Sequence, residues 1–508
     1  MNTNEIRRSM AAVILGMGLV LALTGLGNVD YTWVGGDGNW SDIYAETGTQ
    51  GWDSSPYPQA DNRTQWEYNA SGLTVTIDVD DAKISVMQAM LHSGSLEIKT
   101  TDSAVNKLSI VGEGTSGRQD FGSWTNATLT FDVPVVISDH EYARQIRSGK
   151  SGDTRVIFKQ EISGDGSLNL NCYNSGYCGG VAMQAANTYT GDTFWYSGTL
   201  SAPLRLEHTH ALQNSSLDVG GSDITSTNRV RFIAEGTHVL GGLTGSRDVP
   251  MDGKTVHIGN NDASTIYSGT LSDGALGKIG SGTLTLNGAN TYTGDTTVMG
   301  GTLILGADGS LASPTISVDA GATFDVSAKS GFNLGNGQTL SGMGTVTGAV
   351  SVANGASLAP GDSPGSTVYT SDQTWGGGGI YEWEIQNWTG DTPAVDWDLI
   401  EISDTESDPA LAVAATDGDP FIIKVMEYDL TNFSVSPLEQ TFEVLRADGG
   451  ITGVNANYFT FDTSSWSQGG RWGITQDGNS LYLTYIPEPS TLALLGLAMT
   501  ALLNRRRR

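Results

Sequence analysis

The sequence predicts an all-β protein built as a β-solenoid, and three observations lead to this prediction. Thr, Val, Ile and Leu alternate with Gly, Asn, Asp and Ser over most of the chain, which is the two-residue period of strands with one buried face. Few stretches after residue 30 carry a helical period. Turn signals recur about every 8 to 12 residues, so short strands would stack as coils that bury their apolar side against their neighbours.

The charge balance limits the partners of this protein. The chain has 26 Lys and Arg against 55 Asp and Glu, a net charge of -29, with 38% hydrophobic residues. That hydrophobic content is sufficient for a packed core. Nucleic acid and anionic lipid would be repelled by so acidic a body, so we expect no nucleic-acid partner.

Residues 1–27 have the layout of a secretory signal peptide. Arg7 and Arg8 precede an apolar run over residues 10–23, and small residues follow it. The residues after the arginine pair fit the twin-arginine route poorly. We therefore expect export by the general secretion machinery.

Residues 28–70 are expected to form a non-repeating N-terminal cap. A solenoid end must be covered because an open strand edge would otherwise pair with another chain. Four tryptophans stand here among Gly, Asp and Pro: Trp33, Trp40, Trp52 and Trp66. Packing within the cap is the favoured role. Tryptophans also stack on sugars, so glycan binding by these side chains is the alternative.

The solenoid proper is expected over residues 71–374, and it contains an internal repeat. The octapeptide ANTYTGDT occurs at residues 186–193 and again at 289–296. GDGSLNL (164–170) precedes the first copy and GSGTLTL (280–286) the second. Between these segments and the octapeptide the first copy has 15 residues and the second has two, which indicates a 13-residue insertion.

The presumed insertion contains both cysteines of the chain, Cys172 and Cys178. In an exported protein two cysteines this close together favour a disulfide that pins a protruding loop. A redox or metal-binding pair is the alternative, but five intervening residues and no adjacent histidine make a poor metal site.

The second copy resembles a known repeat. GSGTLTLNGANTYTGDTTVMGGTLILG (280–306) is similar to the autotransporter-associated β-strand repeat, and the degenerate first copy spans 164–200. The resemblance implies a right-handed parallel β-helix at the cell surface.

Residues 375–485 have a different texture, with longer and more apolar strands such as GIYEWEIQNW and FIIKVMEY. We expect a compact antiparallel, β-sandwich-like cap that closes the solenoid.

The last segment, residues 486–508, is unlike the rest. A Pro-Glu-Pro-Ser sequence is followed by an apolar run over 491–503 and four arginines. As a helix the 13-residue run would be roughly 20 Å long against about 30 Å of hydrocarbon. Such a short hydrophobic helix suits transient membrane insertion, with the arginines held in the cytoplasm.

This tail resembles the PEP-CTERM sorting signal of Gram-negative bacteria. The resemblance implies cleavage by an exosortase, a membrane enzyme with a cysteine nucleophile, while the chain is tethered to the inner membrane. The sorting motif would be Pro487, Glu488, Pro489 and Ser490, and the membrane-stop charges would be Arg505, Arg506, Arg507 and Arg508.

No catalytic residue is predicted. The acidic stretches 78–81, 396–401 and 416–420 lack a diagnostic spacing and are expected to be solvated strand ends, with Ca²⁺ only a weak alternative. His208 and His210 are expected on one face of a strand, where a third metal ligand is missing. We therefore expect neither a metal nor another cofactor.

The sequence supports the hypothesis of an exported surface or extracellular-matrix β-helix with a structural or adhesive role, for which exopolysaccharide in a biofilm is the expected partner. A carbohydrate-active β-helix enzyme, either a polysaccharide lyase or a hydrolase, is one alternative. A glycan-binding surface module is the other.

Overall fold

In the computed structural model the protein is built from β-strands and one 3₁₀ turn, η1 (Ala456–Tyr458), over the part of the chain that the structure describes. That part comprises residues 19–23, 29–33, 38–39, 68–69, 73–77, 82–84, 86–87, 90–100, 103, 107–110, 120–125, 127–138, 144–151, 155–172, 180–197, 203–220, 230–431 and 440–487. The chain divides into two compact units, the first with residues 1–293 and 309–312, the second with 294–308 and 313–508.

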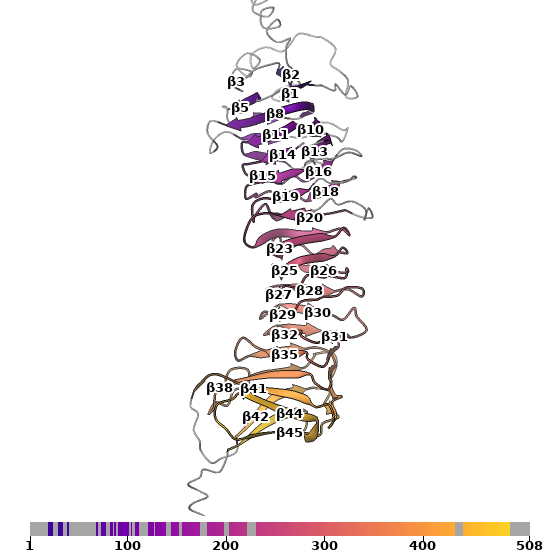
Figure 1. Cartoon of the computed structure of the whole chain (residues 1–508), viewed down its shortest axis with the longest axis vertical. Helices are drawn as coiled ribbons and strands as arrows, with labels where there is room; N and C mark the ends of the chain where they lie inside the picture. The colour runs from indigo at the N-terminus through magenta and orange to yellow at the C-terminus, as the bar shows by residue number, and fades with distance from the viewer. Residues whose placement is uncertain are drawn as a thin grey trace, which may run out of the picture. The chain divides into compact units, whose positions relative to one another are not determined.

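The first unit contains the strands β1 to β26 (Figure 1). They are β1 (Leu19–Leu23), β2 (Val29–Trp33), β3 (Gly38–Asn39), β4 (Tyr68–Asn69), β5 (Leu73–Ile77), β6 (Ala82–Ile84), β7 (Val86–Met87), β8 (Met90–Thr100), β9 (Leu108–Ile110), β10 (Asp120–Thr125), β11 (Ala127–Asp132), β12 (Val135–Ile137), β13 (Arg144–Ser151), β14 (Arg155–Phe158), β15 (Ile162–Gly164), β16 (Leu168–Cys172), β17 (Val181–Met183), β18 (Thr193–Ser197), β19 (Leu204–Leu206), β20 (Leu212–Asp218), β21 (Val230–Phe232), β22 (His238–Thr244), β23 (Val249–Ile258), β24 (Thr265–Tyr267), β25 (Leu271–Lys278) and β26 (Thr283–Leu286).

Parallel ladders organise this unit, as the sequence predicts. One ladder runs through β8, β11, β14, β17, β19 and β21. A second runs through β10, β13, β16, β18, β20, β22, β23 and β25, and a third through β6, β9, β12 and β15. Within the described strands of this unit, the antiparallel pairs are those of β1 with β2 and with β7. The expected β-helix is therefore confirmed.

Each coil returns to the same ladder after 23 to 27 residues. Leu129 pairs with Val156, Val156 with Val181, Val181 with Leu204 and Leu204 with Val230. All five side chains are buried. Strand alternation sends their neighbours outward, so each coil contributes the same kind of side chain to the same column of the core.

The second unit contains the strands β27 to β46. They are β27 (Thr296–Val298), β28 (Thr302–Leu305), β29 (Thr315–Val318), β30 (Thr323–Asp325), β31 (Phe332–Leu334), β32 (Thr339–Gly342), β33 (Thr345–Thr347), β34 (Val350–Val352), β35 (Ser357–Pro360), β36 (Ser366–Tyr369), β37 (Gln373–Trp375), β38 (Ile380–Asn387), β39 (Leu399–Ile402), β40 (Leu411–Val413), β41 (Phe421–Thr431), β42 (Gln440–Ala447), β43 (Ile451–Thr452), β44 (Phe459–Ser465), β45 (Arg471–Asp477) and β46 (Ser480–Ile486).

The expectation of an antiparallel, sandwich-like region over residues 375–485 is correct only for its last strands. β38, β39, β40, β41, β43 and β44 all pair in parallel with strands of the coil before them. Parallel pairing therefore continues across residue 375. Among the described strands of this region, antiparallel ladders involve only β46, which lies between β42 and β45.

The coils of the second unit lengthen toward its C-terminal end. Along one ladder the partner residues are 21 residues apart at Thr302 and Thr323, 33 apart at Val368 and Glu401, and 45 apart at Glu401 and Arg446. Loops are thus added to the coil while the ladder is kept. These longer loops and strands account for the change in sequence pattern after residue 375, from which a separate C-terminal β domain was predicted.

An aromatic cluster fills the end of the second unit. Trp388 contacts Trp466, Trp472 and Tyr485, with ring centroids 4.9 to 6.4 Å apart. Phe442 packs against Trp388 and Trp472. All five residues are buried. β45, β46 and this cluster therefore cover the apolar interior where the last parallel strands end.

Among the described residues no helix has the length and hydropathy to cross a membrane. The expected C-terminal helix lies in residues 488–508, outside the described part. Most of the expected signal peptide and N-terminal cap also lie outside it, although the backbone of β1 falls within residues 1–27. The signal peptide therefore stays a prediction.

The stacked rings of Phe131 and Phe158 give a test of the ladder. Their centroids lie 4.9 Å apart on neighbouring coils and both side chains are buried. We expect Phe158→Ala to destabilise the first unit by about 3–5 kcal/mol, because it leaves a cavity in the column. Urea unfolding followed by tryptophan fluorescence measures this. Ile266→Ala, at a side chain that is 59% exposed, is the control and should change little. Equal losses of unfolding free energy for the two variants would contradict a stabilising role of the Phe131–Phe158 stack.

Candidate functional site

The repeated octapeptide forms a corner of the coil in both copies. In the first copy it lies between β17 and β18, and in the second it follows β26 and precedes β27. The second residue of the motif, Asn187 or Asn290, is buried in each case. A buried amide must satisfy both its oxygen and its nitrogen, so its partners define the role of the corner.

Asn187 joins the coil before it to the coil after it. Its Oδ1 accepts a hydrogen bond from the backbone N of Ile162 (2.8 Å), and its Nδ2 donates to the carbonyl oxygen of Ala211 (2.8 Å). Its own backbone N donates to the carbonyl of His210 (3.1 Å). One side chain thus connects three successive coils through backbone groups.

Asn290 repeats this pattern in the second copy. Its Oδ1 accepts from the backbone N of Leu271 (2.9 Å), and its Nδ2 donates to the carbonyls of Gly288 (3.0 Å) and Ser310 (3.2 Å). Its backbone N donates to Ser310 as well (3.1 Å). The motif is therefore a structural element that holds coils together.

Buried hydroxyl groups extend the corner. Tyr189 Oη, Thr193 Oγ1 and Ser215 Oγ form a chain with distances of 2.5 and 2.7 Å, and Ser215 donates to the carbonyl of Gly191. Burial raises the pKa of Tyr189 far above its ordinary value, so it stays protonated. A Cβ on Gly191 would lie 2.2 Å from the carbonyl oxygen of Gly166, which explains the glycine in the motif.

The hydrogen bonds correct the expected alignment of the two copies. Gln184 N donates to the carbonyl of Phe158, and Asn287 N donates to the carbonyl of Tyr267 at the equivalent point before each octapeptide. β17 is thus the counterpart of β26, and the two copies align without a gap from these strands to the end of the octapeptide. The prediction of a 13-residue insertion is therefore wrong, because GDGSLNL (164–170) is not the structural counterpart of GSGTLTL (280–286).

The cysteines accordingly lie at the end of β16 and, by sequence position, between β16 and β17. The backbone of Cys172 ends β16, while Cys178 lies outside the described residues. The disulfide therefore stays a prediction. Trp33 ends β2, and Trp40, Trp52 and Trp66 are also outside the described part, so their roles remain expectations.

Lys278, the last residue of β25, is a buried charged residue that sequence reasoning missed. Its side chain is buried, and its Nζ donates to the carbonyls of Ile279 (2.7 Å) and Gly280 (3.0 Å). Burial lowers the pKa of this amine. The lysine thereby stabilises the turn that leads into β26. A Gly-Ser-Gly turn after a lysine is the only signal for it in the sequence.

His208 and His210 lie in the turn after β19, not on a strand as expected. Their ring centroids are 5.9 Å apart, and the backbone N of His210 donates to Nδ1 of His208 (3.0 Å). His238 on the next coil is only 1% exposed, and its Nε2 contacts the carbonyl of Ala234 (3.0 Å). No group of three or more metal-ligating side chains occurs within the described ranges.

The acidic stretches are partly solvated, as expected. Asp417 and Asp419 are exposed, whereas 78–81 is outside the described residues. Asp398 contradicts the expectation because it is 1% exposed. Its carboxylate accepts from the backbone N of Gly365 (2.8 Å) and of Glu384 (2.9 Å), and burial raises its pKa well above the ordinary range. It ties two segments of the coil together.

Two segments of the chain match known families. Residues 276–305 match the passenger-associated-transport-repeat, and residues 486–508 match the PEP-CTERM protein-sorting motif. No curated protein matches the chain. The two matches confirm the resemblances found in the sequence. They support an exported surface protein that is sorted by an exosortase-type system.

The corner asparagine provides a test. Asn187→Ala would leave the backbone N of Ile162 and the carbonyl of Ala211 buried without their partner. Each such group costs about 1–3 kcal/mol, so we expect a loss of roughly 2–6 kcal/mol in the free energy of unfolding. Asn287→Ala removes an amide with one long contact to Ser268 (3.4 Å) and should cost far less. Chemical unfolding of both variants compares the two free energies of unfolding. Similar losses would mean that the Asn187 side chain does not stabilise the corner.

We expect His238 to make the first unit sensitive to acid. Burial of the ring lowers its pKa, and Lys254, His208 and His210 add repulsion, while the hydrogen bond to Ala234 opposes the shift. The unfolded chain therefore binds protons at a higher pH than the folded chain does. Stability should fall as the pH drops below about 6.5. Unfolding at pH 7.5 and pH 5 measures this, and His238→Phe should reduce the difference. An unchanged difference would exclude His238 as its source.

Proposed function

We propose that the protein is a non-enzymatic β-helical scaffold of the cell surface or extracellular matrix, with a structural or adhesive role in exopolysaccharide. The observation that carries the proposal is the exposed end of β46, which directly precedes the sorting motif in the sequence. β46 ends at Ile486, which is 51% exposed, and Pro487 follows directly. A processing enzyme could therefore reach the motif without unfolding the coils.

The polar groups of the described coils support a structural role. Asn187 and Asn290 satisfy backbone groups of adjacent coils, and the chain of Tyr189, Thr193 and Ser215 is buried. Asp398 is likewise engaged by two backbone N–H groups. These side chains contribute to stability and are not arranged as a nucleophile with a base.

Processing would follow from the chemistry of the tail. An exosortase-type cysteine would attack a peptide carbonyl near the motif, and the apolar segment with Arg505 to Arg508 would remain in the membrane. The coils would then be released or transferred to a surface partner.

The mass of the C-terminal peptide of the mature protein from its native host tests this proposal. We expect the segment after the Pro487–Ser490 region to be absent. A variant with Pro487→Ala, Glu488→Ala and Pro489→Ala should retain it. Asp477→Ala, on the exposed end of β45, is the matched control and should be processed normally. Recovery of Arg508 in the unaltered mature protein would mean that the tail is a lasting anchor.

A further inference from the structure

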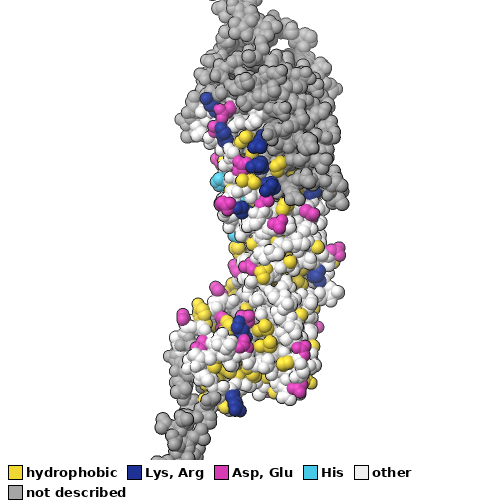
Figure 2. Space-filling model, viewed as in Figure 1, with side chains coloured by type: hydrophobic (Ala, Val, Ile, Leu, Met, Phe, Trp, Pro, Cys, Tyr) yellow, Lys and Arg dark blue, Asp and Glu magenta, His cyan; other side chains and the backbone are white. Residues whose placement is uncertain are grey.

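Cations are distributed unevenly along this acidic chain. Residues 97–278 contain 14 Lys and Arg against 19 Asp and Glu, whereas residues 279–487 contain only 4 against 24. Figure 2 shows dark blue Lys and Arg side chains gathered over the strands that Figure 1 labels β14 to β20. A surface on the first unit is therefore much less acidic than the net charge of the whole chain suggests.

Two arginines lie side by side on this surface. Arg205 on β19 and Arg231 on β21 are in-register partners of a parallel pair, and Ala182 on β17 and Ile157 on β14 continue the row. Neighbouring strands are about 4.8 Å apart. The side chain of Arg231 is 44% exposed and that of Arg205 is 30% exposed. The row thus presents two guanidinium groups followed by two uncharged side chains.

Each guanidinium group is held by its Nε atom. Arg205 Nε donates to Oε1 of Glu207 (2.8 Å), and Arg231 Nε donates to both carboxylate oxygens of Asp252 (2.9 and 3.0 Å). Asp252 also accepts from the backbone N of Phe232 (2.9 Å). Nη1 and Nη2 of both arginines have no hydrogen-bond partner within the described residues. Those donors can bind a carboxylate or sulfate in the bidentate manner that arginine favours.

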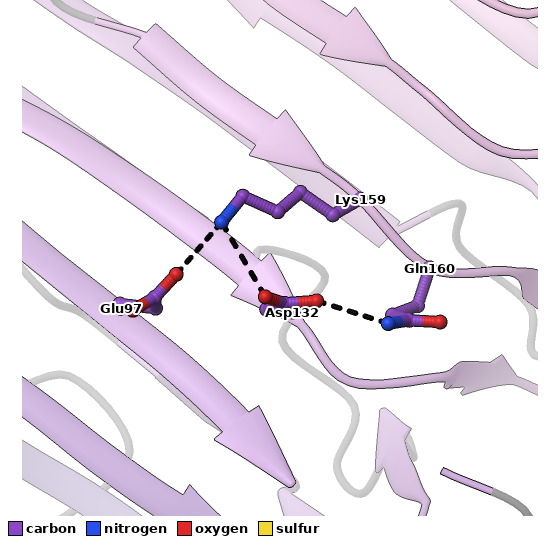
Figure 3. Close-up of polar contacts among 4 residues, drawn as sticks. All are labelled: Glu97, Asp132, Lys159 and Gln160. Atoms are coloured by element: carbon purple, nitrogen blue, oxygen red, sulfur yellow. Dashed lines mark hydrogen bonds and ion pairs between the residues drawn. The ribbon is translucent and has the colours of Figure 1, made fainter.

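Lys159 on the same sheet shows the contrasting arrangement. It follows β14 and its Nζ lies between Glu97 of β8 (2.8 Å) and Asp132 of β11 (3.4 Å), while Gln160 donates to Asp132 (Figure 3). Hydrogen bonding with Glu97 raises the pKa of Lys159 further, against the effect of burial. This lysine therefore connects the end of β14 to β8 and β11 through ion pairs. The arginine pair differs because its acids engage one edge of each guanidinium group only.

We propose that Arg205 and Arg231 form a binding site for an acidic polysaccharide whose sugars carry carboxylate or sulfate groups. The strand spacing is close to the length that one sugar residue adds to an extended chain, so anionic groups of one polymer could meet both arginines. Duplex nucleic acid carries one charge per about 1.7 Å, a denser charge than one acidic group per sugar residue, so the acids around the pair would repel it more strongly than they repel the polysaccharide. This inference rests on the proposed surface role and names its ligand class.

Binding of polygalacturonate to the exported chain tests the site, with neutral dextran as the reference polymer. We expect the double variant R205Q/R231Q to bind polygalacturonate at least tenfold more weakly and to show a smaller salt dependence. The control R446Q/K424Q removes the same charge at two other ion pairs, Arg446 with Glu401 (3.0 Å) and Lys424 with Glu382 (3.3 Å), and should bind normally.

If both double variants bind polygalacturonate equally weakly, net charge alone explains the loss of binding, and the proposal of a site at Arg205 and Arg231 is wrong. Binding of duplex DNA or of anionic lipid vesicles with the same loss in R205Q/R231Q would overturn the assignment to a polysaccharide. If R205Q/R231Q unfolds at a lower urea concentration, R205K/R231K keeps the charges and should still bind more weakly, because lysine lacks the planar fork. Normal C-terminal processing together with unchanged polygalacturonate binding would reject the site while leaving the surface role intact.

Discussion

The in-register stacking of parallel strands is the constraint on which the rest of the structure depends. Leu129, Val156, Val181 and Leu204 occupy one buried column because each coil returns to the same register. A slip of one residue would turn every side chain of a strand to the opposite face, so the column and the register enforce each other. The same register sets Arg205 beside Arg231 on the outer face.

The sequence carries the local part of this information. Alternation predicts which residues are strands and which side chains are buried, as in Thr283–Leu286, and the repeated octapeptide marks a recurring corner. Parallel and antiparallel strands share the same alternation, however. The partner of Val368 is Glu401, and that of Glu401 is Arg446, so pairing across residues 375–485 depends on where a long loop returns. No local pattern encodes that return.

The candidate site divides in the same way. The sorting tail can be recognised from the sequence because an apolar segment between Pro-Glu-Pro-Ser and four arginines is a distinctive pattern. The burial of Asp398 cannot be predicted from the sequence. The backbone N–H groups that donate to its carboxylate belong to Gly365 and Glu384, which are distant from it along the chain. His208 and His210 satisfy the strand alternation that predicted them, yet the turn after β19 includes both.

The three-coil connection made by Asn187 has a consequence for the order of folding during export. The carbonyls of His210 and Ala211 follow the asparagine by 23 and 24 residues, so a chain that emerges N-terminus first cannot complete the corner until the next coil has left the translocation channel. Ordered structure would therefore advance one coil behind the point of emergence. Each newly completed corner would hinder backsliding through the channel, and the growing fold would act as a ratchet that pulls the remaining polypeptide outward.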